Sequence, residues 1–199
     1  MTPRSLAVVV PTITGREESL ERILYAYEQT LRGREYELIV VRDEPSWPRA
    51  CNVGYLKTSA DVVHFGADDL EPLPGWWQAA MRWLSRWNEL PAAKVYNADG
   101  EFDNAIDGND KAQVWFTRVP IMRRDQYERI GPWPEQLTYY ADVWVSEKAA
   151  SLGIVTRILY KYAFVHHWSQ IGRVDSQANL TRAWAELLRL RGGFVHAGD

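Results

Sequence analysis

Two adjacent carboxylates, Asp68 and Asp69, directly follow an apolar segment at residues 61–65 and a Gly66-Ala67 pair. Neighbouring carboxylates in one turn repel each other unless a cation lies close by. A divalent cation with oxygen ligands removes that conflict. Two acids can equally well cap the turn before a helix. The pair alone therefore leaves a metal site and a plain turn open.

Three further side chains have chemistry suited to the same kind of site. Asp142 begins a predicted helix, where a carboxylate either caps the helix or removes a proton from a substrate. His166 and His167 end a strand-like segment at residues 154–166. Imidazole beside carboxylates suits Mn²⁺ better than Ca²⁺. Neighbouring residues on a strand face opposite sides, so we expect one of the two histidines, preferably His166, to bind the metal.

The first elements of the chain must bring these groups together. An apolar strand is expected at residues 6–10, and a helix from a Thr14–Glu17 capping box to Gly33 follows it. Further strands are expected at residues 36–41 and 61–65. Ligands of open α/β sheets bind beyond the carboxyl ends of the strands. Three such ends carry polar residues, which are Thr12, Asp43 and the Asp68-Asp69 pair.

The rest of the chain alternates between helical and extended patterns. A short helix is expected at residues 46–57, and Pro74-Gly75 begins another whose apolar stripe indicates core packing. The later pattern predicts strands at 94–98, 114–122 and 154–166 and helices at 123–130, 142–152 and 175–191. We therefore predict a single α/β domain over residues 1–199. It would consist of a nucleotide-binding half (1–90), an acceptor-binding half (91–175) and a C-terminal helix with its tail (176–199).

Composition limits the partners and the compartment. The 199 residues carry a net charge of −3, which predicts no nucleic-acid or anionic-membrane partner. No apolar run approaches the ~20 residues that a membrane span needs. The single cysteine, Cys51, predicts a small buried side chain without an internal disulfide. These features favour a cytoplasmic protein.

Three segments together resemble a known family. They are residues 8–12, residues 39–43, and residues 61–69 with Pro74-Gly75-Trp76. In this order they resemble the nucleotide-binding half of family 2 inverting glycosyltransferases of the GT-A fold. The resemblance covers about the first 80 residues well and extends loosely to about residue 170. It implies a mixed, mainly parallel sheet flanked by helices. This sequence departs from the family's Asp-x-Asp motif, because Gly66 and Ala67 stand where its first acid is expected.

The resemblance also implies roles for individual residues. A nucleoside-diphosphate sugar, with UDP favoured, would contact a set of residues comprising Pro11, Thr12, Arg16, Asp43, Asn52, Asp68 and Arg173. Mn²⁺ or Mg²⁺ would bind among Asp68, Asp69, His166 and His167. Asp142 would act as base toward a hydroxyl of a sugar or protein acceptor. Separately from the resemblance, sugar faces stack on aromatic rings, so we expect one or two of four tryptophans near the predicted site loops to line the acceptor groove: Trp115, Trp133, Trp144 and Trp168.

The sequence is also compatible with two other functions. A nucleotidyltransferase also places acids and metal at an α/β sheet, but residues 11–16 contain a single glycine where that class carries a Gly-rich loop. A nucleotide-sugar-binding module with a degenerate site would account for the missing first acid. The donor sugar, the acceptor and the oligomeric state are not predicted.

Overall fold

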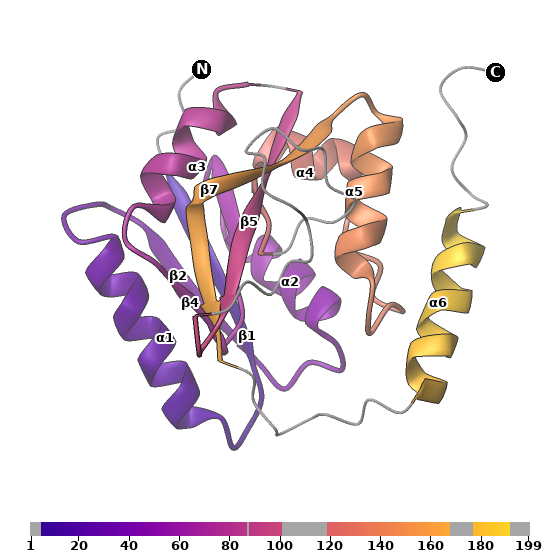
Figure 1. Cartoon of the computed structure of the whole chain (residues 1–199), viewed down its shortest axis with the longest axis horizontal. Helices are drawn as coiled ribbons and strands as arrows, with labels where there is room; N and C mark the ends of the chain where they lie inside the picture. Colours follow the sequence, from indigo (N-terminus) through magenta and orange to yellow (C-terminus); the bar gives the residue numbers. More distant parts are fainter. Residues whose placement is uncertain (1–4, 87, 101–118, 168–176, 192–199) are drawn as a thin grey trace.

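The first strands and helices of the chain form a β-α-β-α-β unit (Figure 1). A computed structural model describes residues 5–86, 88–100, 119–167 and 177–191. The unit consists of β1 (Leu6–Thr12), α1 (Glu17–Thr30), β2 (Glu37–Arg42), α2 (Trp47–Leu56) and β3 (Val62–Phe65). β1 pairs in parallel with both β2 and β3. The predicted parallel half is therefore confirmed.

A second, smaller sheet accompanies the first. The first sheet has the order β2-β1-β3-β6, in which β6 (Ile121–Arg123) is antiparallel to β3. The second has the order β4-β7-β5, with β4 (Leu70–Pro72), β7 (Val155–His166) and β5 (Glu89–Asn97). β4 was not predicted, because three residues carry no periodicity. β5 begins earlier than the predicted 94–98 strand.

Helices flank the sheets and mostly match the predicted ranges. They are α3 (Trp76–Leu84), α4 (Arg124–Ile130), α5 (Ala141–Ser151) and α6 (Gln177–Arg191). The predicted capping box at Thr14–Glu17 is wrong. The N-cap of α1 is Arg16, whose side chain makes no capping hydrogen bond. Thr14 does not cap the helix because its hydroxyl and its N–H both donate to Asp43. No described helix has the length and apolar character to cross a bilayer.

A glycine allows α2 to lie directly against β1. A Cβ at Gly54 would lie 2.2 Å from Cγ1 of Val9, so any larger residue would push the helix away from the sheet. The Ser46 side chain accepts a hydrogen bond from the N–H of Arg49 and fixes where α2 begins. This close contact sets the position of Trp47 at the start of the helix. Cys51 on the same helix is buried and free, as predicted.

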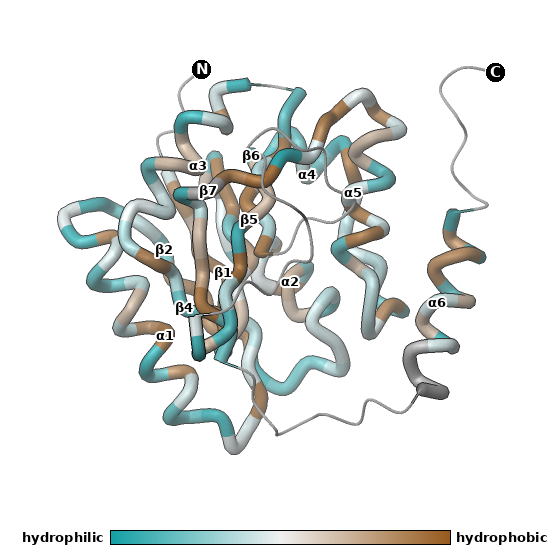
Figure 2. The backbone as a smooth tube through the Cα atoms, viewed as in Figure 1, coloured by the Kyte–Doolittle hydropathy of each residue, from teal (hydrophilic) through white to brown (hydrophobic). Residues whose placement is uncertain are grey.

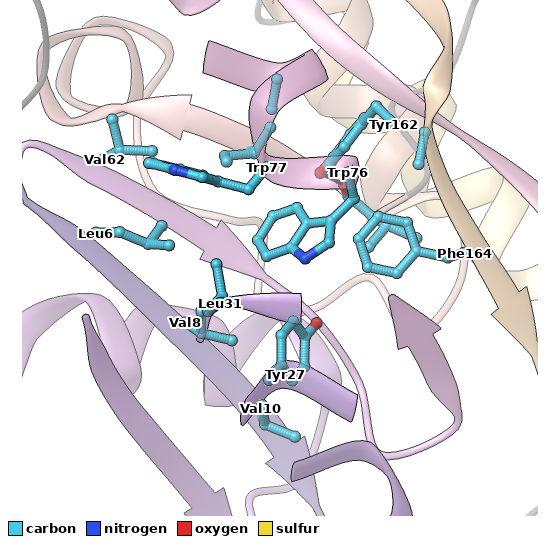
Figure 3. Packing of buried hydrophobic residues seen from close by; sticks show 14 of the residues in the cluster. Leu6, Val8, Val10, Tyr27, Leu31, Val62, Trp76, Trp77, Tyr162 and Phe164 are labelled. Atoms are coloured by element: carbon cyan, nitrogen blue, oxygen red, sulfur yellow. Dashed lines mark hydrogen bonds between the residues drawn. The ribbon is translucent and has the colours of Figure 1, made fainter. Parts of the chain in front are cut away.

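The core between α1, α3 and the sheets is strongly aromatic. Hydrophobic residues gather on the central strands (Figure 2). Trp76 is fully buried and contacts Tyr27, Tyr162 and Phe164, with ring centroids 5.7 to 6.1 Å apart (Figure 3). The predicted core stripe of α3 is confirmed for Trp76, Ala80 and Leu84, and Trp87 lies outside the described residues.

A fully buried histidine connects two tyrosines in this core. His64 Nε2 lies 2.8 Å from the Tyr27 hydroxyl, and His64 Nδ1 lies 3.2 Å from the Tyr162 hydroxyl. The single Tyr162 proton is donated to the Val119 carbonyl. Nδ1 of His64 must then donate to Tyr162, and Nε2 must accept from Tyr27. Burial lowers the pKa of His64 to about 3, so the imidazole stays neutral.

This neutral histidine predicts a loss of stability in acid. The pKa of His64 in the folded state lies below the unfolded value of about 6.5. As the pH falls below about 6.5, the unfolded chain therefore binds a proton at this histidine while the folded chain does not. The stabilisation is complete above about pH 6.5 and declines as the pH falls toward 3. Between about pH 7.5 and pH 5 the free energy of unfolding should fall by about 2 kcal/mol through His64 alone.

Urea unfolding of the wild type and His64→Gln at both pH values isolates this contribution. Glutamine keeps one donor and one acceptor but does not titrate. The wild type should lose about 2 kcal/mol more than the variant over this interval. Equal losses in the two proteins would rule out a neutral buried imidazole in the folded state.

Candidate functional site

A buried carboxylate organises the carboxyl ends of β1 and β3. Asp68 is 2% exposed. Its Oδ2 accepts a hydrogen bond of 2.6 Å from the Thr12 hydroxyl, and its Oδ1 accepts one of 2.8 Å from Nη1 of Arg16. The Ser19 hydroxyl donates to the Asp68 backbone carbonyl at 2.6 Å. Asp68 thus joins the end of β1, the start of α1 and the turn after β3.

Asp69 points toward the end of β7. Its Oδ2 lies 3.7 Å from Nε2 of His166 and 3.6 Å from Nη1 of Arg16. The antiparallel pairing of β4 with β7 aligns Leu70 with His166 and so brings residues almost a hundred positions apart to one place. Asp69 and His166 are each partly exposed, with 17% of the side-chain surface accessible. They can therefore meet a ligand from solvent.

The two neighbouring histidines contact different acids. His167 Nε2 lies 2.7 Å from Oε2 of Glu71, whereas His166 lies beside Asp69. This separation agrees with the alternation expected along a strand. His166 is therefore the histidine that lies beside the acidic pair, and His167 is held by Glu71.

A cavity of about 250 Å³ opens beside His166. Asp142 and His166 both line it, although they come from α5 and β7. Its other walls are mainly apolar and aromatic, formed by Trp47, Pro48, Leu70, Val95, Val119, Pro120, Thr138, Tyr140 and Ala141. Two predicted site residues therefore share one cavity. Trp47 and Tyr140 were not predicted as lining residues, because nothing in their local pattern indicates which way a helix start will face.

Asp142 is not the N-cap of its helix. The N-cap of α5 is Tyr140, with φ of 65°, and Asp142 lies in the first turn. Its Oδ1 accepts a hydrogen bond of 2.9 Å from the N–H of Val143. A helix N-terminus favours a negative side chain in this turn. The capping alternative is thus corrected, while the carboxylate remains at the cavity wall.

Gly66, one of the two positions where the first acid of the motif is expected, has no room for a side chain. A Cβ at Gly66 would lie 2.6 Å from the Tyr27 hydroxyl, which is held in the buried core by His64. The Gly66 carbonyl accepts a hydrogen bond of 2.9 Å from Nε1 of Trp47. The glycine is therefore required by its surroundings, and the acid cannot be restored there without moving Tyr27.

The predicted nucleotide contacts lie in two environments. Pro11 and Thr12 end β1 and are buried. Asp43, at the end of β2, is exposed and accepts hydrogen bonds from the N–H and the hydroxyl of Thr14, at 2.7 and 3.0 Å. The N–H of Thr14 lowers the pKa of Asp43, so the side chain is a carboxylate at neutral pH. Arg173 lies outside the described residues.

Asn52, a predicted nucleotide contact, makes its side-chain hydrogen bonds within the protein. Its amide nitrogen donates to the Trp133 carbonyl and to Glu135, and its amide oxygen accepts from the Tyr127 hydroxyl and the Trp133 N–H. These four bonds use the whole hydrogen-bonding capacity of the amide. Asn52 therefore joins α2 to the segment after α4.

Two of the four tryptophans considered for the acceptor groove, Trp133 and Trp144, lie in the described residues. Trp133 is 1% exposed and packs on Trp47 and Phe65, so it belongs to the core. Trp144 is partly buried and packs against the same core cluster. Neither lines the cavity, whereas Trp47 does. Trp115 and Trp168 lie outside the described residues.

Comparison with known proteins identifies the fold. No protein-family model matches the sequence, and no curated protein matches it. The structure is similar to that of S. aureus TarS, a glycosyltransferase, with a TM-score of 0.64 and 15% identity over 96% of this chain and 44% of TarS. A TarS 1–349 structure gives 0.68 and 14% identity over 94% of this chain and 64% of that one. The chain thus spans less than two thirds of either structure, and it has a mixed α/β fold of the GT-A-like kind, with mainly parallel strands flanked by helices.

The crowding at Gly66 predicts a specific pair of effects on stability. Gly66→Ala should destabilise the protein by about 1–3 kcal/mol, because the new methyl group overlaps the Tyr27 hydroxyl. In a Tyr27→Phe background, which lacks that hydroxyl, the same substitution should cost clearly less. Urea unfolding of the two single variants and the double variant measures this coupling. The same cost in both backgrounds would show that Tyr27 does not exclude a side chain.

Proposed function

We propose that this protein is an inverting glycosyltransferase that moves a sugar from a nucleoside-diphosphate sugar to a hydroxyl acceptor. One observation carries the proposal. Asp142 and His166 line the same cavity, and the acid beside His166 belongs to the turn after β3. That turn is where open α/β sheets bind ligands. The likeness in fold to TarS supports the same class of reaction.

Asp142 is the proposed base. A hydroxyl acceptor in the cavity would lose its proton to the Asp142 carboxylate as its oxygen attacks the anomeric carbon of the donor sugar. The bond between that carbon and the diphosphate breaks on the opposite face, which inverts the configuration. A positioned base of this kind contributes about 10²- to 10⁴-fold to the rate. The apolar side chains that line the cavity would limit the access of bulk water to the reacting atoms.

The donor set beside the cavity fits a divalent cation with two protein ligands. Donors bound at about 2.1 Å to one ion lie ~3 Å apart at right angles and ~4.2 Å apart when opposite. The 3.7 Å between Asp69 Oδ2 and His166 Nε2 falls within that interval. No larger group of His, Cys, Asp or Glu suited to a metal occurs in the described part of the chain. Diphosphate oxygens and water would complete the shell, as is common for Mg²⁺.

We assign Asp69 and His166 to hold Mn²⁺ or Mg²⁺. Asp68 is already bonded to Thr12 and Arg16, so it would act on the site through Arg16. When bound, the cation would stabilise the charge that develops on the departing diphosphate. Imidazole beside carboxylate favours Mn²⁺ of the two ions.

The nucleotide would lie at the carboxyl ends of β1 and β2. Asp43 is an exposed carboxylate there, and each of its oxygens has a second lone pair beyond the bond to Thr14. It can accept a hydrogen bond from a base N–H, which favours uracil. We therefore propose a UDP-sugar as donor and the hydroxyl of a sugar or protein as acceptor.

A nucleotide-sugar-binding module is the second candidate function. It is favoured by Gly66 and Ala67, neither of them acidic, where the first acid is expected, and by the ion pair between Asp68 and Arg16. Such a module would bind UDP and a sugar nucleotide without turning it over. The two functions differ in turnover alone, so binding and reaction must be measured separately.

Replacing the base should abolish reaction and preserve binding. A panel of labelled UDP-sugars with Mn²⁺ is used to measure transfer or hydrolysis by the wild type and by Asp142→Asn. We expect turnover to fall about 10²- to 10⁴-fold while UDP affinity stays within about twofold. Unchanged turnover in Asp142→Asn would exclude Asp142 as base, and tight UDP binding without any turnover by the wild type would favour the binding module.

The two histidines provide a matched pair for locating the cation. In the presence of UDP, His166→Ala should weaken Mn²⁺ binding by about tenfold or more, because a direct ligand is lost. His167→Ala should leave the affinity within about threefold, because His167 is held by Glu71. Titration followed by the electron paramagnetic resonance (EPR) signal of free Mn²⁺ measures both. A larger loss in His167→Ala than in His166→Ala would reverse the assignment.

A further inference from the structure

Arg16 places a fixed positive charge within the acidic pair. Its Nη1 lies 2.8 Å from Asp68 Oδ1 and 3.6 Å from Asp69 Oδ2. The same Asp69 oxygen lies 3.7 Å from His166 Nε2. Arg16 is only 17% exposed at its side chain, and Asp68 is almost fully buried. The guanidinium is therefore held beside the oxygen that would bind a divalent cation.

This arrangement changes the electrostatic argument for a metal. Two adjacent carboxylates attract a cation because their charges repel each other. Here Arg16 already relieves that repulsion, so the pair offers a divalent cation less attraction than its sequence indicates. A divalent cation on Asp69 would also lie close to the guanidinium of Arg16. Even when solvent partly screens the two charges, their repulsion at this separation weakens cation binding by about tenfold or more.

A diphosphate would reverse this balance. It adds negative charge and oxygen ligands for the cation. Its oxygens can also accept hydrogen bonds from a guanidinium, which matches phosphate geometry well. Arg16 would then lie between two anionic partners, Asp68 and the diphosphate, and its repulsion of the cation would be offset.

We propose that Arg16 is a resident counter-ion that keeps the Asp69–His166 pair from holding a divalent cation alone and makes cation and diphosphate bind cooperatively. The inference rests on the donor and cation assigned under the proposed function. Its consequence is that the empty protein binds Mn²⁺ weakly, and that the cation is retained only when the sugar nucleotide is present. Binding of each ligand must then strengthen the other by the same factor.

Removing the charge of Arg16 tests the proposal by binding alone. Mn²⁺ is titrated with and without UDP into the wild type and Arg16→Gln, and free Mn²⁺ is followed by its EPR signal. Without UDP, Arg16→Gln should bind Mn²⁺ about tenfold or more tightly than the wild type. The factor by which UDP strengthens Mn²⁺ binding should fall by about tenfold or more in the variant.

Two companion proteins separate this effect from folding and from general charge. Arg16→Gln leaves a buried carboxylate without its counter-ion, so a second variant combines it with Asp68→Asn and keeps the local net charge. That double variant should also show a reduced coupling, but by less than Arg16→Gln, because the guanidinium beside Asp69 is lost while the local net charge is unchanged. Arg22→Gln removes an exposed arginine of α1 that bonds to Ser19, and it should behave as the wild type.

The outcomes distinguish this proposal from the proposed function. Equal Mn²⁺ affinity and equal coupling in the wild type and in both Arg16 variants would overturn the role of Arg16. The absence of Mn²⁺ binding to any variant, with or without UDP, would also overturn it, because Arg16 would have no cation to exclude. Neither result bears on Asp142 as base, which is decided by the turnover of Asp142→Asn.

Discussion

The structure around the site depends on the burial of one carboxylate, that of Asp68. A charge that leaves water at this position must be matched by a partner and by hydrogen bonds. Arg16 provides the opposite charge, and the Thr12 hydroxyl provides a second hydrogen bond. Satisfying Asp68 thus holds the end of β1, the first residues of α1 and the turn after β3 in one arrangement. It also leaves Asp69 as the acid of the pair that lies beside His166.

The second sheet completes the site from distant parts of the chain. β4 is only three residues long, yet its pairing with β7 brings His166 to Asp69. The close contact of α2 with β1 at Gly54 positions Trp47, and the start of α5 brings Asp142 to the same cavity. The proposed base, the two proposed metal donors and an aromatic wall therefore come from α5, the turn before β4, β7 and α2.

The aromatic core limits which residues can occupy the turn after β3. The hydroxyl of Tyr27 occupies the volume that a side chain at Gly66 would need, and it stays there because it donates to neutral His64. The hydrogen-bonded chain continues through Tyr162 to the carbonyl of Val119, a residue that lines the cavity. The absence of a side chain at Gly66, one of the two positions where the first acid is expected, is therefore linked to a buried polar network, whose members each have a partner. Replacing Gly66 alone would disturb that network.

Local patterns in the sequence determined the parallel strands, most helix positions, the acidic turn and the alternation of His166 and His167. These features depend on apolar periodicity and on residues near one another in the chain. Only the tertiary structure decided the partners of the polar groups. The side-chain amide of Asn52 makes its hydrogen bonds within the protein, and Trp133 lies in the core. Arg16 forms an ion pair with Asp68. Whether a polar side chain binds a ligand depends on what lies against it, and a residue's sequence neighbours do not specify contacts made across 50 to 100 positions. β4 could not be predicted from the sequence for the same reason, since its three residues form a strand only because β7 lies beside them.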